Sequence, residues 1–218
     1  MAFRKLFACL GANFALAVSL AACAPSPQQK NHDLTTHIIQ GAHAENVFVD
    51  VSTGDQAAVR HTPSGMVCVL PAHGAFNLEA FPQNAANDGA DCTISEGNMA
   101  ITLLAVRFAT PPTLDAAFSD SVRANASRLG GAIEWMGRPS AADALPPDGL
   151  PHFRMVRLQG DAGGQPTYLR LAMAEKNGWF VQQMVFAPLA NANEAEAKAG
   201  ERWRALISNL APANGAHS

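Results

Sequence analysis

Three segments, at residues 153–159, 167–174 and 179–186, constrain the fold more than any other part of the sequence. Each is an apolar run of strand length, and arginines are interleaved with the apolar residues of the first two. The last two segments are joined by four residues that end in Asn177-Gly178, a pair typical of the tight turn of a β-hairpin. The segments therefore predict a three-stranded meander, and the rest of the chain has to pack around it.

Five further segments predict strands. Residues 47–51 alternate in the period of a strand, and residues 57–61 and 66–70 follow it across short turns. Residues 132–136 form another short candidate. Residues 100–108 are almost continuously apolar, which is typical of a strand that is covered on both faces.

Residues 71–98 interrupt this pattern, because they are dense in Pro, Asn, Gly and Asp and show no periodicity. We expect an irregular loop here, with a short strand or turn at residues 77–81. The run Asn-Asp-Gly-Ala-Asp at residues 87–91 predicts a turn.

Two segments carry the single apolar stripe of an amphipathic helix. The first begins after Thr113, a favourable N-cap residue, and is stopped by Gly130-Gly131. In the second, Asn193 and Glu196 resemble a capping pair. The buried stripes are predicted to be Leu114, Phe118, Val122 and Leu129 in the first helix, and Ala199, Trp203, Leu206, Ile207 and Leu210 in the second.

These elements predict an α+β fold, a mostly antiparallel β-sheet with two main α-helices packed on it. Their order from about Val47 to Leu210, closed by a helix that carries Trp203, resembles the PsbP/Mog1-like group, which includes DcrB-like envelope lipoproteins. The resemblance lies in element order and not in a residue motif. It implies the fold and a largely non-catalytic role in assembly or partner binding, and it transfers no site residue.

The N-terminus has the features of a secretory signal. Arg4 and Lys5 precede an uncharged apolar run that ends in Leu20-Ala21-Ala22-Cys23. This ending resembles the lipobox of bacterial lipoproteins, which implies cleavage before Cys23, acylation of its thiol and attachment to membrane lipid. Ala24, where an aspartate would favour the inner membrane, favours the outer membrane, with the domain in the periplasm. The alternative is an ordinary signal peptide, with Cys23 incidental.

The chain then divides into four parts. Residues 1–22 are the signal peptide, and residues 23–45 are the lipidated cysteine and a flexible tether that opens with prolines and glutamines. Residues 46–212 form a single α+β domain, and residues 213–218 form a disordered tail. Histidines of the tether lack a carboxylate or cysteine at a recognised ligand spacing, so no metal ligand is predicted there.

The four cysteines have separate roles in this interpretation. Cys9 leaves with the signal peptide and Cys23 takes lipid, so Cys68 and Cys92 remain. In an oxidising periplasm this pair predicts one disulfide. The competing interpretation is a reactive thiol at Cys68 with His73 as its base.

The net charge of the chain and its lack of enzyme sequence motifs limit the functions that it can have. Without Arg4 and Lys5, 13 of the 15 basic residues remain against 18 acidic ones, a net charge near −5, which argues against a nucleic-acid partner. The chain carries no Gly-x-Ser-x-Gly, no phosphate-binding glycine loop and no His-Glu-x-x-His. No catalytic, cofactor or metal residue is therefore predicted.

The long loop at residues 137–152 is the candidate partner site, because long loops in compact domains are often functional. Its chemistry-bearing residues are Arg138, Asp143, Asp148 and His152. A second candidate is an anion-binding sheet face, on which Arg157 and Arg170 share a side near Gln182 or Gln183.

We therefore expect a lipid-anchored envelope protein, non-enzymatic, that binds or assists another envelope component. One alternative is a periplasmic, hydrolase-like enzyme with its site near residues 137–152. The other is a periplasmic metal-binding protein that uses histidine and methionine.

Overall fold

The computed structural model describes residues 25–81, 87–139 and 153–210. The signal peptide, Cys23 and residues 213–218 lie outside these ranges. Among the described helices, none combines the length and the apolar character needed to cross a membrane.

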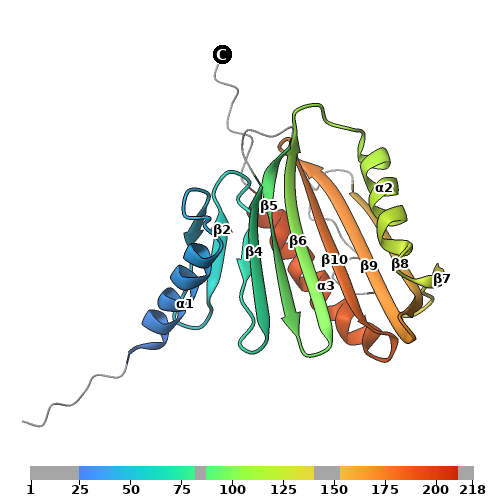
Figure 1. Ribbon diagram of the computed structural model, residues 1–218, viewed down its shortest axis with the longest axis horizontal. Helices are drawn as coiled ribbons and strands as arrows, with labels where there is room; N and C mark the ends of the chain where they lie inside the picture. Colours follow the sequence, from blue (N-terminus) through green and yellow to red (C-terminus); the bar gives the residue numbers. More distant parts are fainter. Residues whose placement is uncertain (1–24, 82–86, 140–152, 211–218) are drawn as a thin grey trace, which may run out of the picture.

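A seven-stranded, fully antiparallel sheet forms the body of the molecule (Figure 1). In spatial order its strands are β4 (Ala75–Phe81), β5 (Asn87–Glu96), β6 (Met99–Phe108), β10 (Trp179–Pro188), β9 (Gln165–Lys176), β8 (Phe153–Ala162) and β7 (Gly130–Glu134). The predicted meander is confirmed as β8, β9 and β10. Its second turn contains Asn177 and Gly178, both with positive φ (57° and 76°), the backbone that an Asn-Gly hairpin turn requires.

A smaller sheet lies beside β4. Its strands, in the order β1-β2-β3, are β1 (Phe48–Asp50), β2 (Ala58–His61) and β3 (Val67–Val69), and all three were predicted. The disulfide between Cys68 of β3 and Cys92 of β5 is present and joins the two sheets covalently. The thiol interpretation of Cys68 is therefore wrong.

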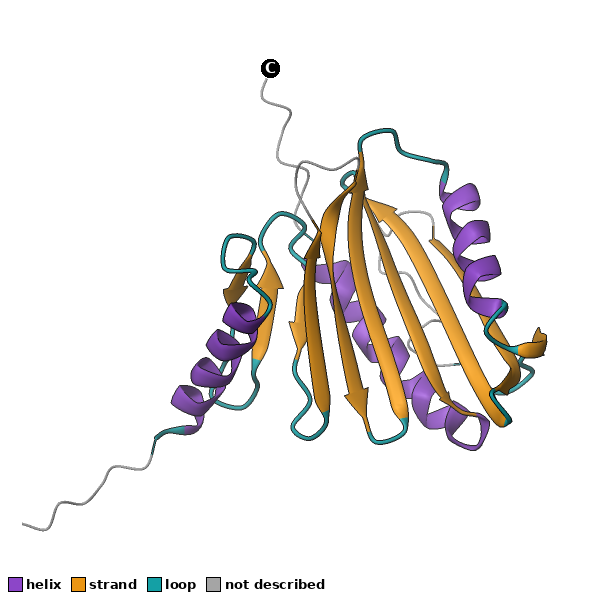
Figure 2. Cartoon of the chain, in the orientation of Figure 1, coloured by secondary structure: helices purple, strands orange, loops and turns teal. Residues whose placement is uncertain are grey.

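Three helices and one short 3-10 turn complete the described part of the chain: α1 (Pro27–Gly41), α2 (Leu114–Ala126), η2 (Leu189–Asn191) and α3 (Ala192–Asn209). The longest, α3, packs on one face of the large sheet against β9 and β10. The opposite face is only partly covered, because α2 lies over β8 and β9, reaches β10 at Gln182, and leaves β4 and β5 without a described helix (Figure 2).

The core fills the space between the large sheet, α3 and the small sheet. The predicted stripe of α3 is buried: Ala199, Trp203, Leu206, Ile207 and Leu210 are each 5% exposed or less. The stripe of α2 is mostly half-buried, and Thr113 caps that helix by accepting a hydrogen bond from the Ala116 amide at 3.2 Å. The α+β prediction is confirmed, with three helices in place of the two main ones expected.

The flexible tether predicted at residues 23–45 is wrong for Pro27–Gly41, which forms α1. Ser26 caps this helix by accepting a hydrogen bond from the Gln29 amide at 3.1 Å, and Pro27 fits its first turn. Thr35 and Ile39 are buried where α1 contacts β1, β2 and β4. The helix is polar overall, so its sequence lacks the broad apolar stripe by which such a helix is recognised.

The irregular loop predicted at residues 71–98 is also wrong, because β4 and β5 form a paired hairpin there. The turn expected at residues 87–91 lies inside β5. This strand pairs with β4 on one side and β6 on the other, so tertiary pairing overrides the poor strand propensity of Asn, Asp and Gly.

The sequence predicted that the strand at residues 100–108 is covered on both faces, but the structure buries only one face of it. In β6 the side chains of Ile101, Leu103 and Ala105 are at most 2% exposed and face the core. The alternate side chains, including Leu104 and Val106, are half-buried on the face that α2 only partly covers.

The disulfide closes a loop with a sequence separation of 24 residues. The Cys68→Ala/Cys92→Ala variant should therefore have a free energy of unfolding lower by up to about 3.5 kcal/mol, the chain-entropy value for such a loop. Urea unfolding of the oxidised protein measures this. Dithiothreitol should destabilise the wild type and leave the variant unchanged, and a wild type insensitive to the reductant would contradict the assignment.

Candidate functional site

The predicted partner loop is only partly described. Arg138 is exposed, just beyond the edge strand β7. Asp143, Asp148 and His152 lie outside the described residues, as does the lipidation site Cys23. The structure therefore does not test these positions.

The predicted side-by-side arginines are found, on the face that α3 covers. Arg157 of β8 and Arg170 of β9 are direct cross-strand neighbours, and Arg170 is fully buried. The carboxylate that pairs with both arginines belongs to Glu196 of α3. Its Oε1 lies 3.0 Å from Nε of Arg157 and 3.5 Å from Nε of Arg170. Glu196 is itself 1% exposed, so it is a buried ionic partner and not the helix cap that its spacing from Asn193 suggests.

Neutral groups complete this ionic cluster. Tyr168 donates its hydroxyl to Glu196, and burial together with the Glu196 carboxylate raises the pKa of that phenol. Arg170 donates to Gln183 Oε1 at 2.5 Å, and Gln183 donates to the Ala199 carbonyl at 3.0 Å. The cluster links three strands to α3. It is a structural element, and the anion-binding face predicted here is occupied by the protein's own carboxylate.

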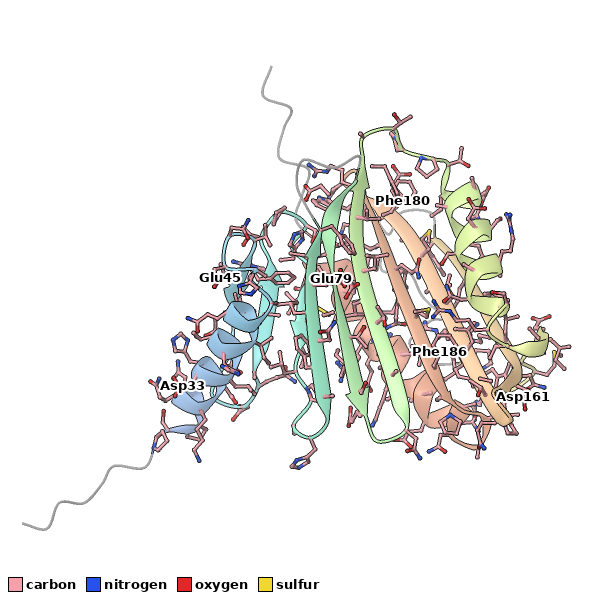
Figure 3. All side chains as sticks on the ribbon, viewed as in Figure 1. Asp33, Glu45, Glu79, Asp161, Phe180 and Phe186 are labelled. Carbon is pink, nitrogen blue, oxygen red and sulfur yellow. A yellow bond between two sulfur atoms is a disulfide. The ribbon has the colours of Figure 1, made fainter. Side chains whose placement is uncertain are left out.

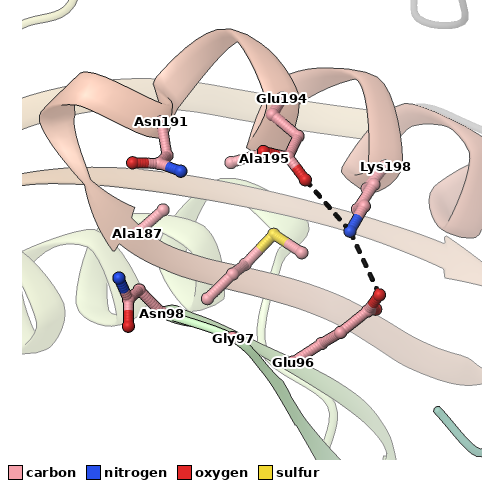
Figure 4. Close-up of a pocket in the computed structure, with 9 residues that line it drawn as sticks. Glu96, Gly97, Asn98, Ala187, Asn191, Glu194, Ala195 and Lys198 are labelled. Carbon is pink, nitrogen blue, oxygen red and sulfur yellow. Dashed lines mark hydrogen bonds and ion pairs between the residues drawn. The ribbon is translucent and has the colours of Figure 1, made fainter. Parts of the chain in front are cut away.

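A cleft opens at the end of the large sheet where β5 turns into β6 and β10 leads into α3 (Figure 4). We name it the strand-end cleft; its volume is about 360 Å³, and it is lined by Glu96, Gly97, Asn98, Met99, Ala187, Asn191, Glu194, Ala195 and Lys198. Glu96 and Asn98 lie across from Asn191 and Glu194. The volume is in the range of small-ligand sites, about 300–1,000 Å³.

The charges of the strand-end cleft are paired with one another. Lys198 Nζ lies 3.1 Å from a carboxylate oxygen of Glu96 and 3.1 Å from one of Glu194. Hydrogen bonds to Glu194 and Glu96 raise the pKa of Lys198, which is therefore a fixed cation. Arg202 does not line the cleft, but its Nη2 lies 3.7 Å from the second oxygen of Glu96 and adds a second positive charge beside that acid.

A second hollow, of about 600 Å³, adjoins the cleft and shares the residues of the β5–β6 turn. Phe186, Pro166 and Pro188 give it an apolar wall, and Gln165 adds an exposed amide. Figure 3 places Phe186 on the face of the sheet opposite α3. The two hollows thus lie on either side of one hairpin turn.

A third hollow, the α2 groove, lies between α2 and the sheet and measures about 260 Å³. Its apolar residues are Leu104, Val106, Phe108, Pro112, Ala117, Met173 and Phe180. Its polar residues are already bonded: Ser121 donates to Gln182 at 3.0 Å, and Asp120 accepts from Arg123 at 2.7 Å.

Apart from Lys198, the described side chains with shifted pKa values lie outside the strand-end cleft. Burial lowers the pKa of His61 to about 4; its ring packs between Phe48 and Trp179, at centroid distances of 5.2 and 5.6 Å. Burial, and then repulsion from Glu79, raise the pKa of Asp91 to about 6. These two carboxylates are a cross-strand pair on the sheet face opposite α3.

The histidines predicted to lie in a tether belong to α1 and its C-terminal turn. His32 Nδ1 lies 2.5 Å from Asp50 Oδ2. Over residues 25–81, 87–139 and 153–210, no three His, Cys, Asp or Glu side chains are grouped as a metal site would require.

Sequence reasoning missed the strand-end cleft. Its residues come from the β5–β6 turn and from the start of α3, about ninety positions apart in the sequence. The Gly97-Asn98 dipeptide is a turn signal between two strands, but the strand before it was not recognised.

Comparisons with known proteins assign neither a family nor a function to the chain. No protein-family model matches the chain, and no curated protein matches it in sequence. One similar solved structure is PA94 of Pseudomonas aeruginosa, a protein of unknown function, with 14% identity and a TM-score of 0.34 over 76% of this chain and 96% of that one. Another is LpqN, involved in cell envelope biogenesis of Mycobacterium tuberculosis, with 10% identity and a TM-score of 0.36 over 82% and 97%. At these values neither likeness assigns a function, and the PsbP/Mog1 resemblance stays a prediction.

Removing the carboxylate of Glu196 should destabilise the fold. In Glu196→Gln, the buried Arg170 loses the charge it faces, and the expected loss in the free energy of unfolding is about 3 kcal/mol. Asp115→Asn is the matched control, because it breaks the exposed pair with Arg154 (2.6 Å) and should cost less than about 1 kcal/mol. Equal losses in urea unfolding would contradict a structural role for the buried cluster.

Asp91 should make stability depend on pH. Its pKa is about 6 in the folded protein and about 3.9 when unfolded, so the folded state holds the proton more tightly. The free energy of unfolding should then fall as the pH rises from about 4 to about 6. Asp91→Asn should be more stable than the wild type at pH 7 and lose this advantage at pH 4. Parallel stability profiles for the two proteins would rule the effect out.

Proposed function

We propose that this chain is a lipid-anchored envelope protein that binds another envelope component and is not an enzyme. The observation that carries the proposal is the sequence Leu20-Ala21-Ala22-Cys23, followed four residues later by the first residue of α1. A lipobox-like segment directly before a folded domain is typical of a protein that works at a membrane surface.

The start of α1 limits how far the domain lies from its anchor. Pro27 is the fourth residue after Cys23, and four extended residues span at most about 14 Å. Because α1 contacts β1, β2 and β4, the body of the molecule is held close to the acylated residue. This short link takes the place of the flexible tether that the sequence alone predicted.

Binding is favoured over catalysis by the chemistry of the hollows. In the strand-end cleft the raised pKa of Lys198 comes from its bonds to two carboxylates, which keep it a cation. His61 and Asp91, whose pKa values are also shifted, lie on other elements. Catalytic sites typically bring shifted titratable groups together in one pocket. This arrangement supports a binding role for the described surface.

Acylation can be tested with an alkyne analogue of palmitate added to growing cells. The wild type should be labelled and recovered with membranes, and Cys23→Ser should lose the label. Cys9→Ser is the matched control, because Cys9 precedes the cleavage site and its variant should keep both label and membrane association. Label retained by Cys23→Ser would overturn the anchor.

A second variant separates the anchor from the signal peptide. When residues 1–22 are replaced by an ordinary secretory signal and Cys23 by Ser, the protein should appear in the periplasmic fraction. Recovery of this protein with washed membranes would show that its attachment does not depend on lipid.

A further inference from the structure

The strand-end cleft has the features of a binding site for a neutral ligand. Its two acids, Glu96 and Glu194, are both paired with its one base, Lys198, so a charged ligand would have to displace an existing pair. Glu194 also supplies, in the first turn of α3, the negative charge that a helix N-terminus favours. Both observations argue against a phosphate or a cation as the ligand.

The groups that remain available are neutral donors and acceptors. Asn98 and Asn191 face each other across the cleft with exposed side-chain amides, and neither amide has a protein hydrogen-bond partner among the described residues (Figure 4). Asn191 is also the N-cap residue of α3, and its side chain makes no capping bond, so its amide is not used by the helix. Each side-chain amide offers two donors and an acceptor, which suits the hydroxyl group, itself both donor and acceptor.

An apolar surface adjoins these polar groups. Met99, Ala187 and Ala195 line the strand-end cleft itself, beside the two amides. Neutral amides beside an apolar wall match a ring that carries hydroxyl groups at its edge and C–H groups on its faces. A sugar ring has this distribution.

We propose that the strand-end cleft binds a saccharide, with the side chains of Asn98 and Asn191 as its hydrogen-bonding groups. The inference names the ligand of the envelope-binding role proposed above and rests on that role for its biological setting. The ligand can belong to a glycan strand of the cell wall or to the headgroup of a glycolipid, since the same chemistry recognises both.

Binding is tested on the mature chain carrying Cys23→Ser, by calorimetry with a soluble β-1,4-linked N-acetylglucosamine tetramer. The Asn98→Ala/Asn191→Ala variant should bind about tenfold more weakly or worse, because two neutral hydrogen bonds are lost. Both residues are exposed, and φ of Asn98 is not positive, so alanine fits the backbone at that position. Circular dichroism verifies that the variant is folded.

The matched control is Asn193→Ala/Asn209→Ala, which removes two exposed amides of α3 that do not line the cleft. It should bind like the parent. No binding by the parent, or equal weakening by the two double variants, would overturn the proposal.

Two further binding assays identify the source of the saccharide. Co-sedimentation with purified cell-wall sacculi indicates a glycan strand, and co-flotation with phospholipid vesicles that contain a glycolipid indicates a headgroup. Binding to a cell-wall stem peptide with no binding to the sugar tetramer would overturn the saccharide assignment. If the wild type took up no palmitate label, the proposed anchor would be wrong, but binding of the sugar measured by calorimetry would be unaffected. The two proposals can therefore fail separately.

Discussion

The carboxylate of Glu196 fixes where α3 lies on the large sheet. It is buried beside Arg157 and Arg170 and accepts a hydrogen bond from Tyr168, so a shift of the helix along the strands would separate these charges in a medium of low dielectric. Ion pairs in such surroundings define a register more sharply than apolar contacts do. Two residues before Glu196 and two after it, Glu194 and Lys198 project into the strand-end cleft. The geometry of the cleft therefore depends on the buried cluster beneath it.

The second constraint is covalent. The small sheet packs against the large one at the side of β4 and β5, and the bond between Cys68 and Cys92 ties them together. His61 of β2 reaches the ring of Trp179 in β10, so the same core extends from the small sheet to the centre of the large one. The small sheet and α3 both pack against the same side of the large sheet. On its opposite side, β4 and β5 are left without a helix from the described part of the chain.

The sequence predicted most of the fold because the strands after residue 100 and both long amphipathic helices have clear periodicity. It failed for α1, whose polar composition is that of a linker and which buries only two residues, Thr35 and Ile39. It failed for β5, since strand pairing on both sides compensates for residues of low strand propensity. The pairing of Arg157 and Arg170 was predictable from strand alternation, whereas their partner Glu196 was not, because long-range charge pairs leave no local pattern. The strand-end cleft joins segments that are distant in sequence, so it could be found only in three dimensions.

The short link between Cys23 and α1 has a consequence for how tightly this protein needs to bind. In the proposed lipid-anchored form, the first residue of α1 lies within about 14 Å of Cys23, so the domain would explore a layer near the membrane and not the full volume of its compartment. Ligands in that same layer are met at a high effective concentration, as they are for the second module of a bivalent binder. Under the proposed anchoring, a cleft with a few neutral hydrogen bonds and a weak affinity in solution would be well occupied at the membrane surface.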